Sequence, residues 1–128
     1  MFNLFGDRRT KQLDQVINLI GTSSASNQAV VLHRLKAASL HFTEAFPQCE
    51  SFEELKFALR PDQCEAMASK AEDLVEKVRV SRQGDEIDEL VFRLLAASLR
   101  HKAGAKWVLD KQSRFIDNMI RAAEGNID

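Results

Sequence analysis

The sequence predicts an all-α protein, a bundle of five or six helices. Apolar residues repeat at helical spacing along most of the chain, and no segment alternates apolar and polar residues as a half-buried strand does. Only 5 Gly and 2 Pro occur among 128 residues, fewer turn formers than a protein of short strands would need. The length suits one domain, so we expect residues 1–128 to form a single helical unit.

The first predicted helix covers residues 7–20 and ends at Gly21. Its apolar residues recur every three or four positions and therefore share one face: Leu13, Val16, Ile17 and Ile20. The segment GTSSASN (21–27) then contains only small or polar side chains, which is typical of a linker. It separates the first helix from the second.

The second predicted helix begins at a cap provided by Ser26 or Asn27 and runs to about Ala45. Such side chains accept hydrogen bonds from the free N–H groups of a first helical turn. Pro47 prevents the helix from continuing, because proline lacks an N–H group and restricts the residue before it. The inward face of this helix comprises Val31, Leu32, Leu35, Ala38, Ser39 and Phe42.

Two further helices follow the Pro47 turn. The capping-box sequence SFEE (51–54) predicts a short third helix over residues 52–59. Pro61 suits the first position of a fourth helix, since its φ angle is already helical, and this helix is expected to reach Gly84. On its solvated face, Asp73 and Lys77 have the spacing of an ion pair. Its apolar side comprises Met67, Ala71, Leu74, Val75 and Val78.

The last part of the chain contains one long helix or two. Four acidic residues in 85–89 favour a helix start, and the basic residues 100–102 favour a helix end, because each complements the helix dipole. The apolar pattern of 87–103 nevertheless continues into 105–123. We predict a break at Gly104 and a last helix over residues 105–124. Its expected inward residues are Trp107, Val108, Phe115, Ile116, Met119 and Ile120.

One short stretch occurs twice. RLKAASL (34–40) and RLLAASL (93–99) agree at six of seven positions, 59 residues apart. The repeat suggests two related helical hairpins, although these residues are common in helices and coincidence remains open. The shared small residues predict close helix–helix contact, since small side chains let helix axes approach. The expected contact face comprises Ala37, Ala38, Ser39, Ala96, Ala97 and Ser98.

Composition argues against several functional classes. The 18 Lys and Arg are balanced by 19 Asp and Glu, whereas a nucleic-acid-binding protein usually has a basic excess. No apolar run approaches the length of a membrane span, and the start MFNLFGDRR acquires charge too early for a signal peptide. Cys49 and Cys64 are best interpreted as reduced thiols, with a single disulfide between them as the alternative. We therefore expect a cytoplasmic protein with neither a nucleic-acid nor a membrane partner.

The stretch HRLKAAS (33–39) resembles the phospho-acceptor motif of histidine phosphotransfer domains, which are small helical bundles. That motif consists of His, any residue, Leu or Ile, Lys, Gly and then small residues. The resemblance implies that His33 accepts a phosphoryl group and that Lys36, one turn further along, offsets its charge. Ala37 takes the place of the glycine in the motif. The resemblance covers about seven residues, and the repeat at 93–99 lacks the histidine.

Metal and catalytic patterns are weak. His41 and Glu44 lie three residues apart on the second helix, and Cys49 and Cys64 lie on either side of the third. No pair has the Cys-x-x-Cys, Glu-x-x-His or His-Glu-x-x-His arrangement of metal sites in helical proteins. We therefore expect no metal, no cofactor and no enzymatic activity.

Protein–protein interaction is the function that remains. We expect a non-catalytic module, such as an adaptor, regulator, inhibitor or assembly subunit, with phosphorelay through His33 as the alternative. Exposed aromatic residues would mark the contact surface. The candidates precede the first helix or flank the Pro47 turn: Phe2, Phe5, Phe46, Phe52 and Phe57. The sequence leaves the partner open, including a second copy of the chain.

Overall fold

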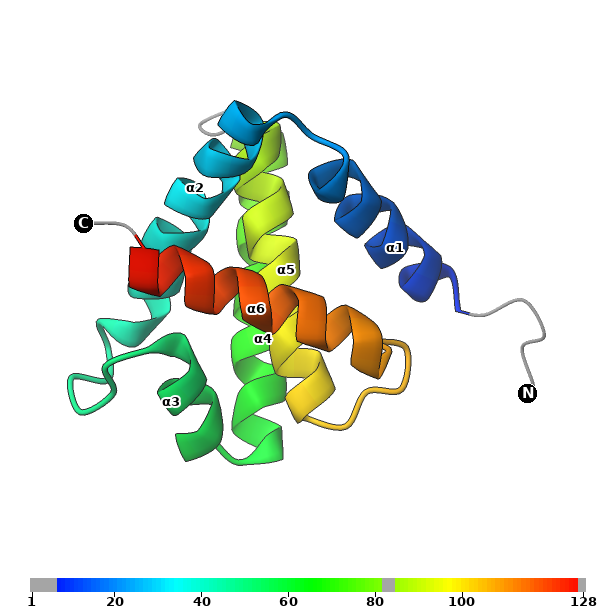
Figure 1. Ribbon diagram of the computed structural model, residues 1–128. Coiled ribbons are helices and arrows are strands. Elements are labelled where there is room, and N and C mark those ends of the chain that lie inside the picture. The colour runs from blue at the N-terminus through cyan, green and yellow to red at the C-terminus, as the bar shows by residue number, and fades with distance from the viewer. Residues whose placement is uncertain (1–6, 82–84, 127–128) are drawn as a thin grey trace.

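Six helices make up the part of the chain that the structure, a computed structural model, describes: residues 7–81 and 85–126 (Figure 1). No strand occurs among these residues, so the predicted all-α bundle of five to six helices is confirmed. In chain order the helices are α1 Arg8–Gly21, α2 Ala25–Thr43, α3 Phe52–Ala58, α4 Pro61–Ser81, α5 Glu86–Lys102 and α6 Asp110–Asn126.

Polar side chains start most of these helices. The Asp7 carboxylate accepts a hydrogen bond from the Arg9 N–H, 2.8 Å away, and thereby caps α1. The cap of α2 is Ser24, whose hydroxyl accepts from the Asn27 N–H at 3.2 Å. The prediction of Ser26 or Asn27 as this cap was therefore wrong. The linker offers several capping side chains in a row, and the pattern alone does not choose among them.

The starts of α3, α4 and α5 agree with the sequence. The Ser51 hydroxyl caps α3 by accepting from the Glu54 N–H at 3.1 Å, and the Glu54 carboxylate accepts from the Glu50 N–H. Pro61 is the first residue of α4. In α5 the acidic opening turn forms a capping box, in which Asp85 and Asp88 each accept from the other's N–H.

The last two helices are separated at Gly104, as predicted. Gly104 has φ 98°, a left-handed conformation that glycine adopts without the clash of a Cβ atom. The expected start of the last helix at residue 105 was wrong, because α6 begins only at Asp110. Trp107 and Val108 therefore lie in the connection, where Val108 is buried and Trp107 is half-buried. Polar contacts stabilise this connection, including one of 2.8 Å between His101 Nε2 and Asp110 Oδ1.

Helix α5 lies at the centre of the bundle. All residues from Leu94 to Leu99 are buried, which is possible only if neighbours surround the helix on every side. Helix α4 packs along it, and α2 and α6 cover other sides, with α6 crossing over both α5 and α2 (Figure 1). The small residues Ala96 and Ala97 belong to this buried segment.

Two carboxylates attach α6 to its neighbours. Asp117 accepts hydrogen bonds of 2.9 Å from the Ser98 hydroxyl on α5 and from Lys56 Nζ on α3. Glu124, two turns further along α6, accepts from the Phe52 N–H at 3.0 Å. It also receives a longer contact of 3.5 Å from the Ser39 hydroxyl on α2. The two serines of the repeated stretch thus both face a carboxylate of α6.

The repeated stretches occupy equivalent positions on α2 and α5, but the hairpins around them differ. Helix α4 packs along α5, whereas α1 diverges from α2 and meets it only slightly (Figure 1). Five of the six residues expected at helix contacts are buried, namely Ala38, Ser39, Ala96, Ala97 and Ser98. Ala37 is exposed, so its place on that face was wrong. An origin by duplication stays a prediction.

Two adjacent alanines test the orientation of α2. We expect Ala38→Leu to lower the free energy of unfolding by about 1–3 kcal/mol, because it adds bulk to a packed contact. Ala37→Leu, the matched control on the exposed side, should change it by no more than a few tenths of a kcal/mol, roughly the difference in helix propensity. Urea unfolding of both variants measures the difference. Equal effects would contradict this orientation of α2.

Candidate functional site

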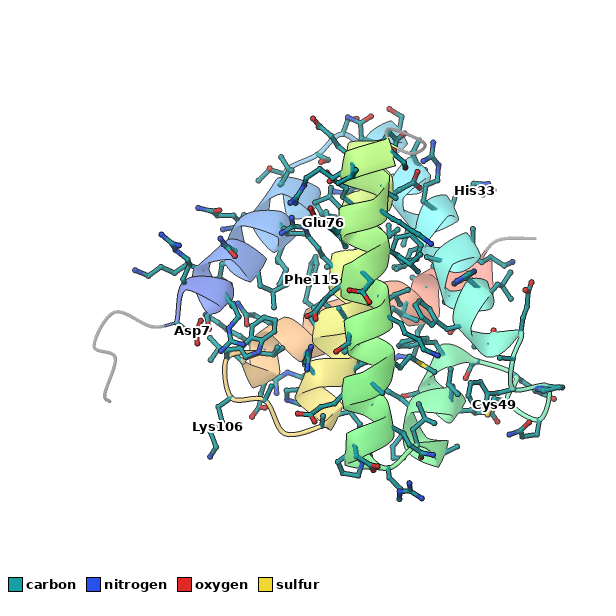
Figure 2. All side chains as sticks on the ribbon, turned by 180° about the vertical axis from the view of Figure 1, so that it is seen from behind. Asp7, His33, Cys49, Glu76, Lys106 and Phe115 are labelled. Atoms are coloured by element: carbon teal, nitrogen blue, oxygen red, sulfur yellow. The ribbon has the colours of Figure 1, made fainter. Side chains whose placement is uncertain are left out.

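The candidate phospho-acceptor lies on the outer side of α2. His33 is exposed, and Figure 2 shows its side chain at the edge of the molecule. Lys36 is half-buried one turn further along. Burial raises the pKa of the Glu124 carboxyl, and the positive charge of Lys36 opposes this rise slightly. Ala37 is also exposed, and its small side chain does not obstruct the approach of another molecule to His33. A phosphotransfer histidine needs this accessibility, whereas a histidine that serves packing would be covered.

The phenylalanines expected at a partner surface separate into three groups. Phe2 and Phe5 lie outside the described residues. Phe52 is only 1% exposed and packs in the core, so its assignment to a partner contact was wrong. The first position of α3 faces inward, which the sequence pattern of a seven-residue helix does not reveal. Phe46 is half-buried against the core, and Phe57 is 72% exposed, with Lys102 Nζ 4.6 Å from its ring centroid.

A groove of about 600 Å³ lies between the C-terminal half of α2 and the middle of α4, and we name it the α2–α4 groove. Its apolar lining comes from both helices and from the turn after α2: Phe42, Ala45, Phe46, Met67 and Leu74. Figure 2 views the molecule from the side on which α4 lies in front, with α2 beside it. An apolar concavity of this size is the usual form of a docking site for apolar side chains.

Aromatic rings stiffen one wall of the α2–α4 groove. His41 and Phe42 lie edge to face with ring centroids 5.3 Å apart, and Phe92 of α5 meets Phe42 in the same way at 6.4 Å. Edge-to-face pairs are favourable because the positive ring edge meets the negative ring face. The sequence offered Phe42 only as a core residue and did not reveal this cluster, because Phe92 comes from a distant part of the chain.

Charged side chains border the α2–α4 groove. Lys70 and Lys77, seven residues apart on α4, are both exposed and line it together with Asp73. Within the described part of the chain none of the three forms an ion pair. The expected pair between Asp73 and Lys77 is therefore not formed. The border carries two lysines and one aspartate, an excess of positive charge beside an apolar floor.

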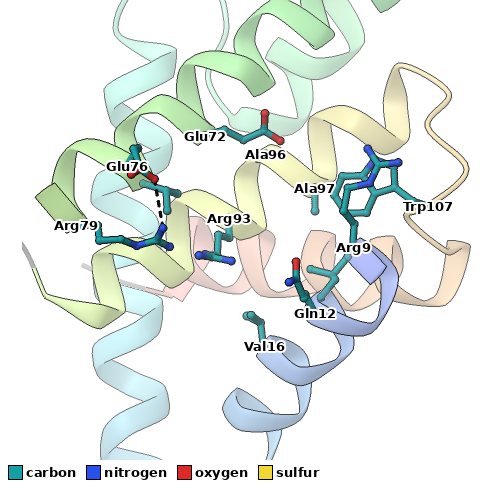
Figure 3. Close-up of a pocket in the computed structure, with 12 residues that line it drawn as sticks. Arg9, Gln12, Val16, Glu72, Glu76, Arg79, Arg93, Ala96, Ala97 and Trp107 are labelled. Carbon is teal, nitrogen blue, oxygen red and sulfur yellow. Dashed lines mark hydrogen bonds and ion pairs between the residues drawn. The ribbon is translucent and has the colours of Figure 1, made fainter. Parts of the chain in front are cut away.

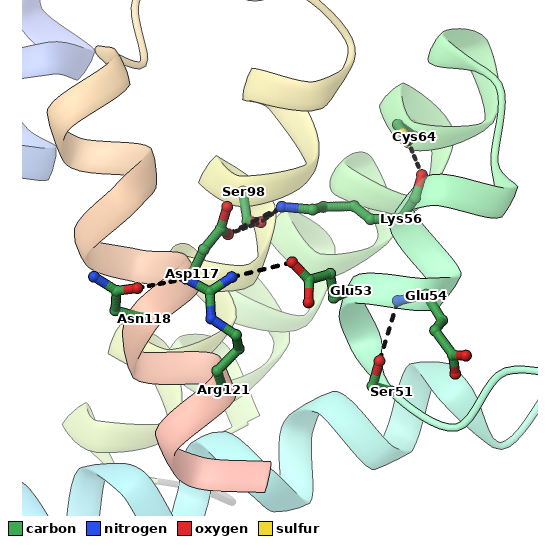
Figure 4. A network of polar contacts seen from close by, with 9 residues as sticks. All are labelled: Ser51, Glu53, Glu54, Lys56, Cys64, Ser98, Asp117, Asn118 and Arg121. Atoms are coloured by element: carbon green, nitrogen blue, oxygen red, sulfur yellow. Dashed lines mark hydrogen bonds and ion pairs between the residues drawn. The ribbon is translucent and has the colours of Figure 1, made fainter. Parts of the chain in front are cut away.

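The cluster of Lys56, Ser98 and Asp117 resembles catalytic machinery but lacks space for a substrate. Lys56 Nζ donates hydrogen bonds to the Ser98 hydroxyl at 2.8 Å and to Asp117 Oδ1 at 2.9 Å (Figure 4). Serine beside lysine occurs in some hydrolases, where the lysine activates the hydroxyl. Here Ser98 is fully buried, and the adjoining hollow has a volume of only about 10 Å³. The cluster therefore joins α3, α5 and α6 rather than holding a reactant.

Two titratable groups are perturbed by burial. Burial raises the pKa of the Glu124 carboxyl, an effect opposed by its hydrogen bonds from the Phe52 N–H and the Ser39 hydroxyl. Burial also raises the pKa of the Cys64 thiol, which favours the unreactive protonated form. Cys64 is fully covered and Cys49 is half-buried, and neither forms a disulfide.

Residues 7–81 and 85–126 contain no group of three or more His, Cys, Asp and Glu side chains placed to hold a metal ion. None of the helices in these ranges combines the length and apolar character needed to cross a bilayer. Comparisons with protein-family models, with curated proteins and with solved structures found no match.

The raised pKa of Glu124 gives a prediction with a defined sign. The folded state binds this proton more tightly than the unfolded state, so the resulting stabilisation is complete below the unfolded pKa, about 4.3. It is lost as the pH rises through the folded pKa. The glutamine of Glu124→Gln cannot ionise. The difference in the free energy of unfolding, variant minus wild type, should therefore increase from about pH 4 to about pH 7.

Urea unfolding across this pH range measures that difference. Glu65→Gln, the same substitution at an exposed position of α4, is the control for the chemical change itself. A Glu124→Gln curve parallel to that of wild type would show that burial does not perturb this carboxyl.

The Lys56 cluster gives a prediction about stability. Lys56→Met keeps most of the apolar stem but leaves Asp117 and Ser98 without their charged donor. We expect the free energy of unfolding to fall by about 1.5–3 kcal/mol, the usual loss of a hydrogen bond to a charged group. Lys106→Met, at an exposed position in the α5–α6 connection, should change it by less than about 0.5 kcal/mol. An unchanged Lys56→Met variant would disprove the structural role.

Proposed function

We propose that this protein is a non-catalytic protein–protein interaction module whose docking surface is the α2–α4 groove. The observation that carries the proposal is an apolar floor bordered by lysines that have no ion-pair partner in the described part of the chain. An adaptor, regulator, inhibitor or assembly subunit would use such a surface. A cytoplasmic location, which the sequence favours, belongs to the same proposal.

The form of the groove indicates the kind of segment that would bind. An amphipathic helix docks by placing apolar residues at positions i, i+3 or i+4 and i+7 into a groove between two helices. Phe46, Met67 and Leu74 offer the apolar lining for such residues. Lys70 and Lys77 are two helical turns apart and favour a partner with acidic residues at matching spacing. The partner we propose is therefore an acidic amphipathic helix of another protein.

Reversal of charge at the groove tests this proposal. The double variant Lys70→Glu/Lys77→Glu should lose the partner, because like charges at the border repel an acidic helix. The matched control is Lys106→Glu/Lys111→Glu, which makes the same charge change at exposed positions away from the groove. Affinity capture from the native host, followed by binding measurements with the purified partner, compares the three proteins. Equal binding by both double variants would refute docking in the α2–α4 groove.

Phosphorelay at His33 is a second candidate, favoured by the exposure of this side chain and by Lys36 on the next turn. In that reaction an imidazole nitrogen of His33 attacks the phosphoryl group of a receiver aspartyl phosphate. The aspartate carboxylate leaves, and the phosphoryl group is then bonded to His33. The exposed Ala37 would leave room for the receiver.

Incubation with a phosphorylated receiver domain distinguishes the two candidates. If the interaction module is the correct function, we expect no transfer of label to this protein. An acid-labile phosphate that appears in wild type and disappears in His33→Gln would instead establish the phosphorelay. His41→Gln, which changes an exposed histidine two turns further along α2, is the matched control and should keep the label in that case.

A further inference from the structure

A second hollow lies on the other side of α4, between α1, α5 and the α5–α6 connection, and we name it the Arg93 cavity (Figure 3). Its volume is about 250 Å³. Residues 72, 75, 76 and 79 of α4 line it, whereas the α2–α4 groove uses residues 67, 70, 73, 74 and 77. The two sites are therefore separate, and an inference about one does not depend on the other.

The floor of the Arg93 cavity is apolar and formed by small residues. Ala96 and Ala97 of α5 are 3% and 1% exposed, and Leu13 and Val75 complete the lining beside them. These alanines were expected to bring another helix into close contact. Both alanines are almost fully covered, and the open space lies beside them, between α1 and α4. Trp107 adds a flat aromatic wall, with the guanidinium carbon of Arg9 4.9 Å from its ring centroid.

Arg93 is the residue that gives this cavity a chemical preference. It is half-buried on α5, one turn before the two alanines, and Figure 3 shows it between α4 and α1. Among residues 7–81 and 85–126 it forms no ion pair and no side-chain hydrogen bond. Its counterpart in the repeated stretch, Arg34, donates at 3.0 Å to both Asp85 and Asp88. Arg93 thus occupies an equivalent helix position but lacks the carboxylate partners that Arg34 has.

A half-buried cation without an anion loses hydration that nothing replaces. The other arginines of the cavity are already paired: Arg9 with Asp7, and Arg79 with Glu76 and Glu89. A guanidinium binds a carboxylate through two parallel hydrogen bonds, which also fix its orientation. The unsatisfied group of this cavity is therefore complementary to one carboxylate.

Two glutamates restrict the ligand further. Glu72 and Glu76 of α4 lie at the same cavity and pair with Arg100 and Arg79, so a second negative charge on a ligand would meet acidic side chains whose arginines are already engaged. The volume is close to the lower limit for ligand sites, which suits a small molecule rather than a folded segment. We infer that the Arg93 cavity binds a small monocarboxylate whose carboxylate pairs with Arg93 and whose apolar body lies on Ala96, Ala97 and Trp107.

The chain has one tryptophan and no tyrosine, so its intrinsic fluorescence reports on Trp107 in the cavity wall. The full chain is titrated with octanoate and, in parallel, with octan-1-ol and suberate, and calorimetry measures the same affinities independently. We expect saturable binding of octanoate. Octan-1-ol has the same body without the charge, and suberate adds a second carboxylate, so both should bind more weakly by about tenfold or more.

Variants at Arg93 give the second arm of the test. Arg93→Gln should weaken octanoate binding by about tenfold or more and leave the affinity for octan-1-ol unchanged. Arg93→Lys, which keeps the charge without the two parallel donors, should lie between wild type and Arg93→Gln. Arg114→Gln, at an exposed position of α6 outside the cavity, should bind as wild type does. Circular dichroism confirms that each variant is folded.

Three results would overturn the inference. They are the absence of saturable octanoate binding by either method, equal affinity for octanoate and octan-1-ol, and an Arg93→Gln variant that binds octanoate as tightly as wild type does.

Discussion

Asp117 and Glu124 lie seven residues apart on one side of α6, and each accepts hydrogen bonds from two neighbouring helices. Asp117 connects α6 with α3 and α5, and Glu124 connects it with α2 and α3. These are costly groups to bury, because a carboxylate that leaves water must recover its hydrogen bonds from the protein. The arrangement fits only one register of α6 across its neighbours, so these contacts specify where the helix lies as well as stabilising it.

Helix α6 also connects two of the longer helices of the bundle. Helices α2 and α5 both contact α6 through Ser39 and Ser98 and also pack against each other, so these contacts together set their separation. Helix α4 follows α5, and the α2–α4 groove lies between α2 and α4. A groove that already exists in the free protein spares a partner the entropic cost of forming it. This is the structural reason to regard the α2–α4 groove as a docking surface.

The sequence was informative wherever a local rule determines the structure. Ser51 and Pro61 mark helix starts, and Gly104 marks the break, because a cap, a fixed φ angle and a left-handed residue are properties of a few adjacent positions. Ser24 was missed because three serines and a threonine of the linker compete for the same role. The late start of α6 coincides with polar contacts of Asp110 with His101 and of Gln112 with the Leu109 N–H, which periodicity does not contain.

The sites themselves were largely invisible in the sequence. Lys56 stands in an ordinary amphipathic pattern, and only the fold brings it to Ser98 and Asp117. Lys70 and Phe42 line one groove, and Phe92 packs against Phe42, only because α4 and α2 both pack on α5. The repeated stretch did indicate that residues 96–98 are buried, but not that Ser98 meets Lys56 of α3 and Asp117 of α6. Tertiary arrangement, which no local pattern encodes, decides such questions.

The attachment of α1 has a consequence for the motions of the protein. Side-chain hydrogen bonds connect it to its neighbours at a few points, from Thr10 Oγ1 to the Trp107 carbonyl, from Gln112 Nε2 to Asp14 Oδ1 and from Gln28 Nε2 to the Ile20 carbonyl. Only Leu13 and Ile20 of the helix are buried. A helix with so little buried surface opens at a smaller free energy than the central pair α4 and α5. The amide protons of α1 would therefore exchange with solvent before those of the other helices. Solvent would reach the interior when α1 alone detaches and the other five helices stay folded.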